Sequence, residues 1–338
     1  VRQRFPAVYQ QVLEKVKRER DHNREAFRLD FWWWFGRRHT DLRSFLEGLP
    51  RYIATVETTK HRFFQFLDAS IRPDNMLVCI GIEMSEHLAI LSSRLHVSWA
   101  LAMGGWLGIG NDPRYSKSRT FDPFPFPLVL DREAVQRESV LDLQQRLRDL
   151  GERLDAFRKE RLAEHSFLTM TGLYNALERL RELENGCDVP PLSEKEREVH
   201  QAGLVSLLKE LHDEIDEAVL AAYGWEDLAP ALVGKPGATL PSPHKSPEQE
   251  AAEEELLARL VALNQERAAE EKRGQVRWLR PDYQIPRLGA RVPQPQAEEL
   301  ALPEIELPES ESRQKCPADG LEQIRLGRGP LAKAPTPV

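Results

Sequence analysis

The feature that most restricts the fold is a run of apolar residues spaced alternately three and four positions apart. The run consists of Val140, Leu143, Leu147, Leu150, Leu154 and Phe157. This spacing places all six along one seam of an α-helix, which is typical of a helix packed lengthwise against another helix. Arg, Glu, Asp and Gln flank the seam, and we expect them on a solvated face. The run therefore predicts a helical bundle.

Two more amphipathic helices follow the seam. The first is expected over residues 169–185, with Gly186 as its end. The second is expected over residues 193–223, where Ser193 and Glu196 form a capping-box pattern and Gly224 ends the helix. Three such helices with short connections predict an all-α helical domain over residues 131–232.

The composition changes again after this domain. Residues 233–247 are rich in Gly, Pro and Ser, which indicates a linker. Residues 248–286 predict a charged docking helix followed by the segment VRWLRPDYQIP. Residues 287–338 are rich in Pro, Glu and Gln and poor in apolar residues, so we expect a disordered tail.

The first part of the chain predicts a mixed domain over residues 1–128. Residues 51–57, 62–67 and 75–83 are rich in Ile, Val, Phe and Thr and are expected to be strands of a mainly antiparallel sheet with helices on one side. A largely apolar helix is expected over residues 86–103, with Ser85 as its cap. The predicted fold class is thus α+β, a mixed N-terminal domain followed by the helical bundle and the tail.

An aromatic run from Phe31 to Phe35 precedes Arg37 and Arg38. Aromatic side chains next to arginines can stack on bases, which makes Arg37 and Arg38 candidates for DNA contact. A strand that buries one side is the more common reading of such a run. We therefore expect at least two of the three tryptophans to lie in the core.

Charge is unevenly distributed along the chain. The net charge is −7, yet residues 1–130 hold 19 Lys and Arg against 14 Asp and Glu, and the remainder holds 28 against 40. A basic first part and an acidic second part are a pattern to weigh when nucleic acid is a candidate partner. The overall charge argues against uniform coating of DNA.

The cysteines and the apolar runs indicate a cytoplasmic protein without a membrane partner. Cys79, Cys187 and Cys316 lie far apart, which fits a reducing compartment and excludes a zinc site built on cysteine pairs. No signal peptide is visible, and no apolar run reaches the roughly 18 residues that a membrane helix needs. Because the first residue is Val, we expect a fragment or the tail of a longer chain.

A glycine-punctuated basic loop lies between the apolar helix and a closing Phe-Pro-Phe-Pro. The last part of the expected helix contains SSRLHVSWAL. Gly104 and Gly105 interrupt the helix, and RYSKSRTFDPFPFP follows the loop. Together with VRWLRPDYQIP, these segments resemble the target-recognition domain of the MmeI-like DNA adenine-N6 methyltransferases and restriction–modification enzymes. The resemblance covers roughly residues 1 to 285.

The resemblance implies a DNA-specificity module of a bacterial restriction–modification or phage-defence system, with double-stranded DNA as its partner. In that family this region decides which sequence is methylated. The methyltransferase domain, with its S-adenosylmethionine, is expected upstream or on a separate chain. The family pattern places base-reading residues at Trp106, Asn111, Asp112, Arg114, Tyr115, Lys117 and Arg119.

The catalytic motifs of an amino-methyltransferase are absent from the sequence. Asp122-Pro123-Phe124 lacks the second proline of the target-amine tetrad, and the glycines after residue 103 do not form GxGxxG. We therefore expect this chain to have no catalytic residues and no cofactor or metal of its own, and whether it counts as an enzyme stays open.

Two other functional classes are kept as alternatives. A helical interaction or scaffold protein would use the bundle and the acidic tail, with the basic N-terminal half only a folded cap. Salt-dependent DNA binding distinguishes this class from a DNA reader, because phosphate contacts give a steep salt slope. A complete enzyme with an unfamiliar site ranks last.

Overall fold

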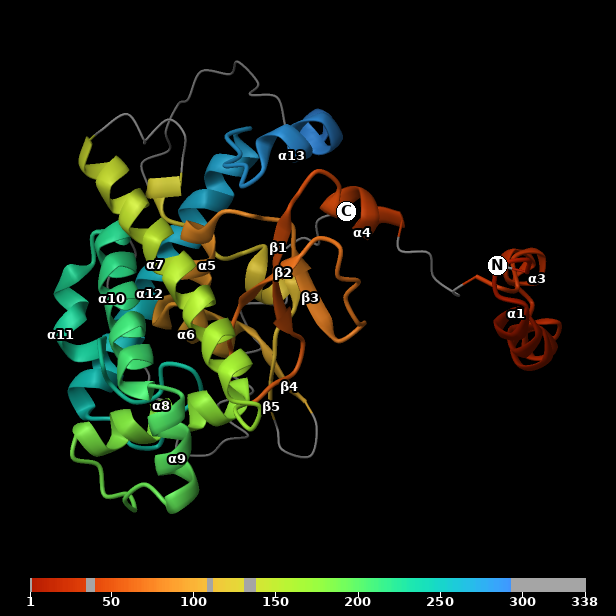
Figure 1. Ribbon diagram of the computed structural model, residues 1–338. Helices are drawn as coiled ribbons and strands as arrows, with labels where there is room; N and C mark the ends of the chain where they lie inside the picture. The colour runs from red at the N-terminus through yellow and green to blue at the C-terminus, as the bar shows by residue number, and fades with distance from the viewer. Residues whose placement is uncertain (1, 35–39, 108–111, 131–137, 293–338) are drawn as a thin grey trace, which may run out of the picture. The chain divides into compact units, whose positions relative to one another are not determined.

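The computed structural model describes residues 2–34, 40–107, 112–130 and 138–292 (Figure 1). Within this part the chain is α+β, as predicted: a small antiparallel sheet with flanking helices precedes a mainly helical part. The domain boundaries predicted around residue 130 and at 232 stay predictions. The tail predicted from residue 287 is described only as far as residue 292.

The elements follow in chain order. The strands are β1 (Arg51–Val56), β2 (Gln65–Asp68), β3 (Leu77–Ile80), β4 (Gly105–Leu107) and β5 (Asp112–Arg114). The helices are α1 (Pro6–Val12), α2 (Arg18–Arg20), α3 (Ala26–Asp30), α4 (Thr40–Leu46), α5 (Ser85–Ser92), α6 (Arg94–Met103), α7 (Glu138–Glu164), α8 (Met170–Glu184), α9 (Glu194–Ala202), α10 (Val205–Tyr223), α11 (Ala229–Leu232), α12 (Pro247–Lys272) and α13 (Pro281–Leu288).

The sheet has the order β2-β1-β3, and both pairings are antiparallel. Ile53 of the central strand lies opposite Phe66 on one side and Ile80 on the other, so these three share a face. That face packs against Leu88 and Leu91 of α5. The opposite face of β1 carries Tyr52 and Ala54, which pack with Leu46 of α4. Helices therefore cover both faces, and the prediction of helices on one side was wrong.

The predicted seam is confirmed in α7. Leu147, Leu150 and Leu154 are buried in the largest core cluster, and α7 packs against α5 and α10 (Figure 1). Gly151 faces α5 so closely that a Cβ would lie 2.0 Å from the carbonyl oxygen of Ser85. Only glycine permits this approach of the two helices.

The charged positions beside the seam are not all solvated. Asp155 and Arg158 are 6% and 2% exposed. The backbone N–H of Phe66 donates to Asp155 Oδ1 at 2.9 Å, and an Arg158 Nη2 donates to the carbonyl of Phe64. These two side chains satisfy one backbone N–H of β2 and one carbonyl just before it on the strand's outer edge, a role that no sequence period reveals.

Two helices expected to be continuous are broken. The helix expected over residues 86–103 divides at Ser93, which has extended backbone, and Ser93 caps α6 by accepting from the N–H of His96 at 3.5 Å. Ser85 is the first residue of α5, not its cap. The helix expected over residues 193–223 divides after Gly203, and Leu204 adopts a φ of 46°. A Cβ on Gly203 would lie 2.3 Å from Leu173 Cδ2, so packing against α8 explains the glycine.

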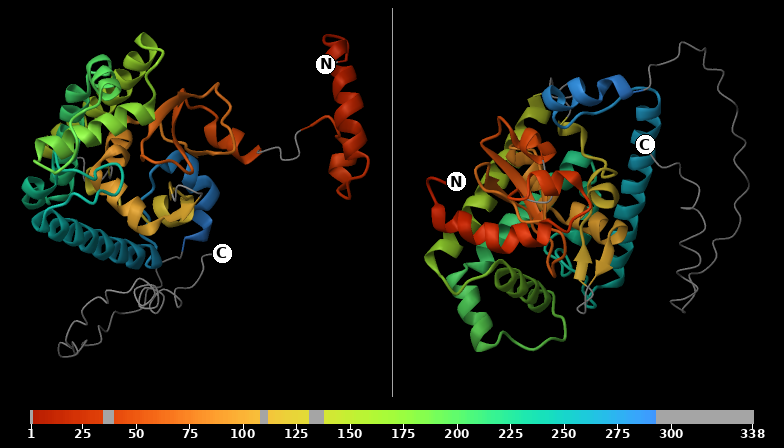
Figure 2. Two further views of the ribbon diagram at one scale, coloured as in Figure 1. Left: turned by 90° about the horizontal axis from the view of Figure 1, so that it is seen from below. Right: turned by 90° about the vertical axis from the view of Figure 1, so that its right-hand side faces the viewer.

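The segment predicted as a linker, residues 233–247, is packed into the fold. Thr239 is 2% exposed, and its carbonyl accepts from the N–H of Arg62 at 3.1 Å. The N–H of Gly237 donates to Glu178 Oε2 at 2.7 Å. α12 follows as a long helix (Figure 2) that buries Leu256 and Leu260.

The segment that contains VRWLRPDYQIP lies against α4. Leu279 packs on the core beneath the sheet, and the ring of Tyr283 lies 5.6 Å from that of Phe45. Arg280 Nη1 donates to the carbonyl of Phe45 at 2.5 Å. Residues of the WLRPDYQ segment therefore hold α4, which packs on one face of the sheet, in place.

The aromatic run near the N-terminus forms no strand among its described residues. Only Trp32 is buried, against Tyr9 at 6.2 Å and beneath the Lys17 ammonium, whereas Trp33 and Trp34 are 51% and 44% exposed. The prediction that at least two tryptophans are core was wrong. The local helices are short and bury little else.

The burial of Leu147 in the core between α7 and its neighbouring helices generates a prediction. Leu147→Asp should lower the free energy of unfolding by about 3 kcal/mol or more, because it places a charge in an apolar interface. The cluster around Leu147 also contains Trp99 of α6, so tryptophan fluorescence and helical circular dichroism should lose stability together in urea. Leu141→Asp, on an exposed position of the same helix, is the control and should change little. Equal stability of the two variants would contradict the packing.

Candidate nucleic-acid interface

The predicted basic loop forms a two-stranded ribbon. Trp106 of β4 lies opposite Pro113 of β5, and Gly105 lies opposite Arg114. The ribbon lies just beyond the end of β1 (Figure 1). Gly104 joins it to α6, and a Cβ there would lie 2.5 Å from the Ala100 carbonyl oxygen and 2.7 Å from that of Arg114. Only glycine fits this junction.

A second backbone segment supports the ribbon from its other side. The N–H of Tyr115 donates to the Glu57 carbonyl at 2.7 Å, and the N–H of Thr59 donates to that of Pro113 at 3.4 Å. Thr58 and Arg114 form an isolated antiparallel bridge. β5 is therefore held between β4 and the residues that continue β1, which gives the ribbon a fixed base.

Arg62 braces this base from beneath. Its guanidinium is buried and donates to Thr55 Oγ1 at 3.0 Å, to the Pro113 carbonyl at 2.9 Å and to the Val56 carbonyl. It also lies 5.1 Å from the centre of the Tyr115 ring. Burial lowers the pKa of Arg62 to about 10, so the group stays cationic at neutral pH. The sequence near Arg62 carries no local signal of this role, because a single arginine shortly before a strand is a common pattern.

Tyr115, one of the expected base-reading residues, lies in the core. Its exposed fraction is 0%, and its hydroxyl lies 2.9 Å from His96 Nε2. Burial raises the pKa of the Tyr115 hydroxyl and lowers that of His96 to about 3. In this arrangement Tyr115 anchors the ribbon and is not available to a base.

The other expected residues are exposed or lie outside the described part. Trp106 is 43% exposed, and Arg114, Lys117 and Arg119 are also exposed. Asp112 is half-buried at the start of β5. Asn111 and the two arginines of the aromatic run, Arg37 and Arg38, lie outside the described residues.

Arg114 and Trp106 lie on opposite faces of the ribbon. Side chains alternate between the faces of a strand, so Leu107 and Arg114 project from one face and Trp106 from the other. The Lys117 and Arg119 side chains follow on a short π-helix, Lys117–Phe121, and neither forms an ion pair with a described residue. One face of the ribbon thus presents Arg114, and the next turn supplies two cations.

Arg114 has an acidic neighbour that is distant in the sequence. Its Nε and Nη2 lie 2.7 and 2.6 Å from Glu57 Oε1. The carboxylate comes from the end of β1 and not from Asp112 or Asp122, the acidic residues nearest to Arg114 in the sequence. A distance of 57 residues along the chain hides this pair from any local pattern.

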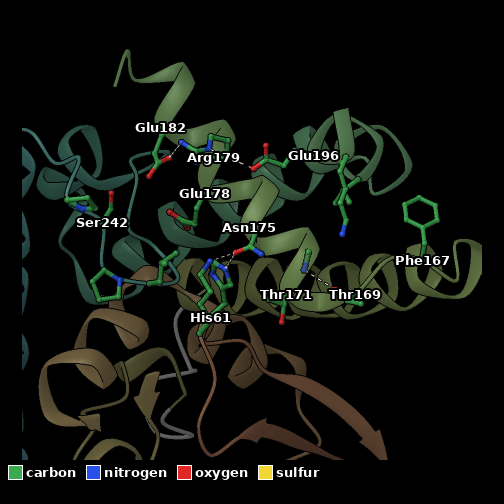
Figure 3. A pocket seen from close by; sticks show the side chains of 17 residues that line it. His61, Phe167, Thr169, Thr171, Asn175, Glu178, Arg179, Glu182, Glu196 and Ser242 are labelled. Atoms are coloured by element: carbon green, nitrogen blue, oxygen red, sulfur yellow. Dashed lines mark hydrogen bonds and ion pairs between the residues drawn. The ribbon is translucent and has the colours of Figure 1, made fainter. Parts of the chain in front are cut away.

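A separate pocket of about 660 Å³ lies where the β1–β2 connection meets α8 and α9 (Figure 3). His61 Nε2 donates to Asn175 Oδ1 at 2.9 Å, and His61 Nδ1 lies 2.9 Å from Thr239 Oγ1. Thr239 in turn donates to Glu178 Oε1 at 3.0 Å, and Lys60 Nζ lies 2.6 Å from Asn175 Oδ1. Burial lowers the pKa of His61. These polar groups satisfy one another and join the sheet to α8.

Two further properties are limited to the described part of the chain. None of its helices combines the length and apolar character that a membrane crossing requires. Nor do its His, Cys, Asp and Glu side chains gather in threes or more as a metal ion would need.

Comparison with known proteins yields a distant similarity. No protein-family model and no curated protein matches the chain. Among solved structures, it is similar to the Type IIL restriction-modification enzyme MmeI in complex with DNA, at 16% identity and a TM-score of 0.46. The alignment covers 78% of this chain and 26% of that one, so this chain spans about a quarter of that enzyme's length. A similarity this distant carries no conclusion about function.

The buried His96 generates a pH prediction. The folded protein keeps His96 neutral down to a pKa of about 3, whereas the unfolded chain takes up a proton below its ordinary pKa of 6.5. Unfolding therefore binds a proton between these values, and the stability contribution is lost as pH falls below about 6.5. Between about pH 7 and pH 5 the loss from this one group should be about 2 kcal/mol.

Urea unfolding at both pH values checks this prediction. His96→Gln removes the titrating ring, so the variant should lose about 2 kcal/mol less on acidification than the parent. His165→Gln replaces a half-exposed histidine outside the ribbon and should keep the parent's pH dependence. Identical pH dependence in all three proteins would show that His96 is not held neutral by burial.

Proposed function

We propose that this chain is a sequence-specific DNA-recognition module that serves an adenine-N6 DNA methyltransferase of a restriction–modification or phage-defence system. The observation that carries the proposal is the β4–β5 ribbon. It is formed by the residues that resemble the MmeI-like target-recognition domain, and it presents Arg114 from a braced base beside Lys117 and Arg119.

The ribbon suits DNA recognition on physical grounds. The major groove of B-DNA admits a two-stranded β-ribbon, and an arginine fork pairs with N7 and O6 of guanine. Lysine and arginine beside the ribbon are suited to phosphates, which position a protein without reading sequence. Arg62 and Tyr115 fix the ribbon from within the core, and a fixed base is needed if one side chain is to meet one base edge.

In this proposal the chain selects the site and another domain performs the methyl transfer. That methyltransferase domain would hold S-adenosylmethionine and the residues that bind the flipped adenine. The chain described here would contribute the double-stranded DNA contact and the sequence preference. Activity of a restriction–modification enzyme would therefore require both parts.

Two substitutions test the ribbon. Arg114→Ala should cost about 1–3 kcal/mol on the preferred sequence and relax the preference at one base pair, because a bidentate base contact is lost. Lys117→Ala should weaken binding to all sequences alike and lower the salt slope by about one unit, because a phosphate contact is lost. Selection from a randomised duplex pool, with Kd measured at several salt concentrations, separates the two effects.

Melting curves of the same variants provide the control. If Arg114 only braces the ribbon through Glu57, Arg114→Ala lowers thermal stability and leaves the sequence preference intact. Unchanged selectivity after substitution of Trp106, Arg114, Lys117 and Arg119 would remove the ribbon from the DNA-reading role. Absence of any salt-dependent DNA binding would favour the scaffold alternative.

A further inference from the structure

The carboxylate of Glu57 holds the guanidinium of Arg114 at the ribbon surface. We propose that Glu57 is a positioning residue that sets the base preference of Arg114 and reduces its attraction to DNA of other sequences. This inference rests on the function proposed above. It adds a determinant from the end of β1, outside the loop that carries the sequence resemblance.

Backbone hydrogen bonds fix Glu57 and Arg114 relative to each other, independently of the ion pair between their side chains. The Glu57 carbonyl accepts from the N–H of Tyr115, the residue next to Arg114, at 2.7 Å. Arg62 Nη2 also donates to that carbonyl at 3.4 Å and to the carbonyl of Pro113 at 2.9 Å. Pro113 and Tyr115 are buried while Arg114 is exposed, so the strand alternation directs the Arg114 side chain outward beside Glu57.

The contact leaves the base-reading edge of the guanidinium open. Glu57 Oε1 accepts from Nε at 2.7 Å and lies 2.6 Å from Nη2, which is the side edge of the planar group. Among the described residues, no group pairs with the end edge, formed by Nη1 and the second hydrogen of Nη2. Two parallel donors on that edge match N7 and O6 of guanine. The carboxylate therefore orients the fork without occupying it.

Holding the side chain in advance favours discrimination. Arginine has several rotatable bonds, and ordering such a side chain on binding costs free energy. A guanidinium held by one edge points its other donors in one direction. It therefore binds a base pair that has acceptors at those positions more tightly than one that lacks them. The nearby negative charge also offsets the attraction of Arg114 to phosphates at any sequence.

Stability of the fold is a poor explanation for this ion pair. The Arg114 and Glu57 side chains are 49% and 26% exposed, and exposed ion pairs contribute little to folding. The buried hydrogen bonds of Arg62 and Tyr115 already secure the ribbon. Glu57→Gln keeps the size and shape of the side chain, so the variant should fold and melt like the parent.

The test measures preference and general affinity separately in the full chain. The probes are a randomised duplex pool and one duplex that the parent does not prefer. Glu57→Gln should reduce the parent's preference at the base pair read by Arg114 by about 3- to 10-fold, a part of the discrimination of one bidentate contact. The same variant should bind the non-preferred duplex about 2- to 5-fold more tightly, with a salt slope steeper by up to about one unit.

Two further variants give the controls. Glu152→Gln removes the carboxylate that pairs with Arg51 at the other end of β1, and it should leave preference and non-preferred binding unchanged. In an Arg114→Ala background, Glu57→Gln should have no further effect on preference, because Glu57 acts through Arg114. A merely structural role of Glu57 would instead weaken binding to both probes together.

The outcomes for the two proposals are distinguishable. If Arg114→Ala relaxes preference but Glu57→Gln does not, the positioning role is overturned while DNA reading by the ribbon stands. If Glu57→Gln weakens both probes equally, the positioning role is likewise overturned. If the parent shows no salt-dependent binding to either probe, the proposed function fails and this inference fails with it.

Discussion

The fold depends on how α7 closes the outer edge of β2. An edge strand presents unpaired backbone groups, which a helix can cover only if its side chains supply the missing partners. Asp155 accepts from the N–H of Phe66, and Arg158 donates to the carbonyl of Phe64 and, at 2.9 Å, to the hydroxyl of Tyr174. The same two side chains thus end the sheet and attach it to the helical part. The buried residues of the sheet and those of the bundle form separate clusters, and these side chains connect the two.

A second buried network fastens the segment between α11 and α12. Arg181 is fully buried and pairs with Glu178 at 3.0 Å and Asp213 at 3.2 Å. Glu178 also accepts from the backbone of Gly237, while Asp216 Oδ1 accepts from the N–H of Arg94 at 2.7 Å. Burial raises the pKa of Asp216 to about 6. Breaking a buried ion pair leaves an uncompensated charge, so these contacts hold the segment against the fold.

β1 connects these buried contacts to the candidate interface. The strand is buried on both faces and continues into Glu57, Thr58 and Thr59, which support β5. Arg62, just before β2, ties the same residues together from within. A surface loop of glycines and basic residues would be mobile alone. Here its base is part of the sheet's own hydrogen bonding, and that rigidity makes a specific contact physically reasonable.

The sequence by itself determined what local period and turn chemistry encode. The seam of α7, the capping box at Ser193, the glycine ends at Gly186 and Gly224 and the three strands around β1 follow from residue spacing, and all are present. The interest in Trp106, Arg114, Lys117 and Arg119 came from the family resemblance, and these four side chains are exposed.

Only the tertiary structure decided which distant groups meet. Glu57 beside Arg114, Arg62 beneath Pro113 and Asp155 at the edge of β2 are contacts between residues 51 to 89 positions apart. The same holds for Tyr115, whose burial depends on Phe64 and His96. A side chain's polarity does not reveal whether water or a buried partner will satisfy it, since both satisfy the same hydrogen bonds. That choice is made by packing, which local sequence does not encode.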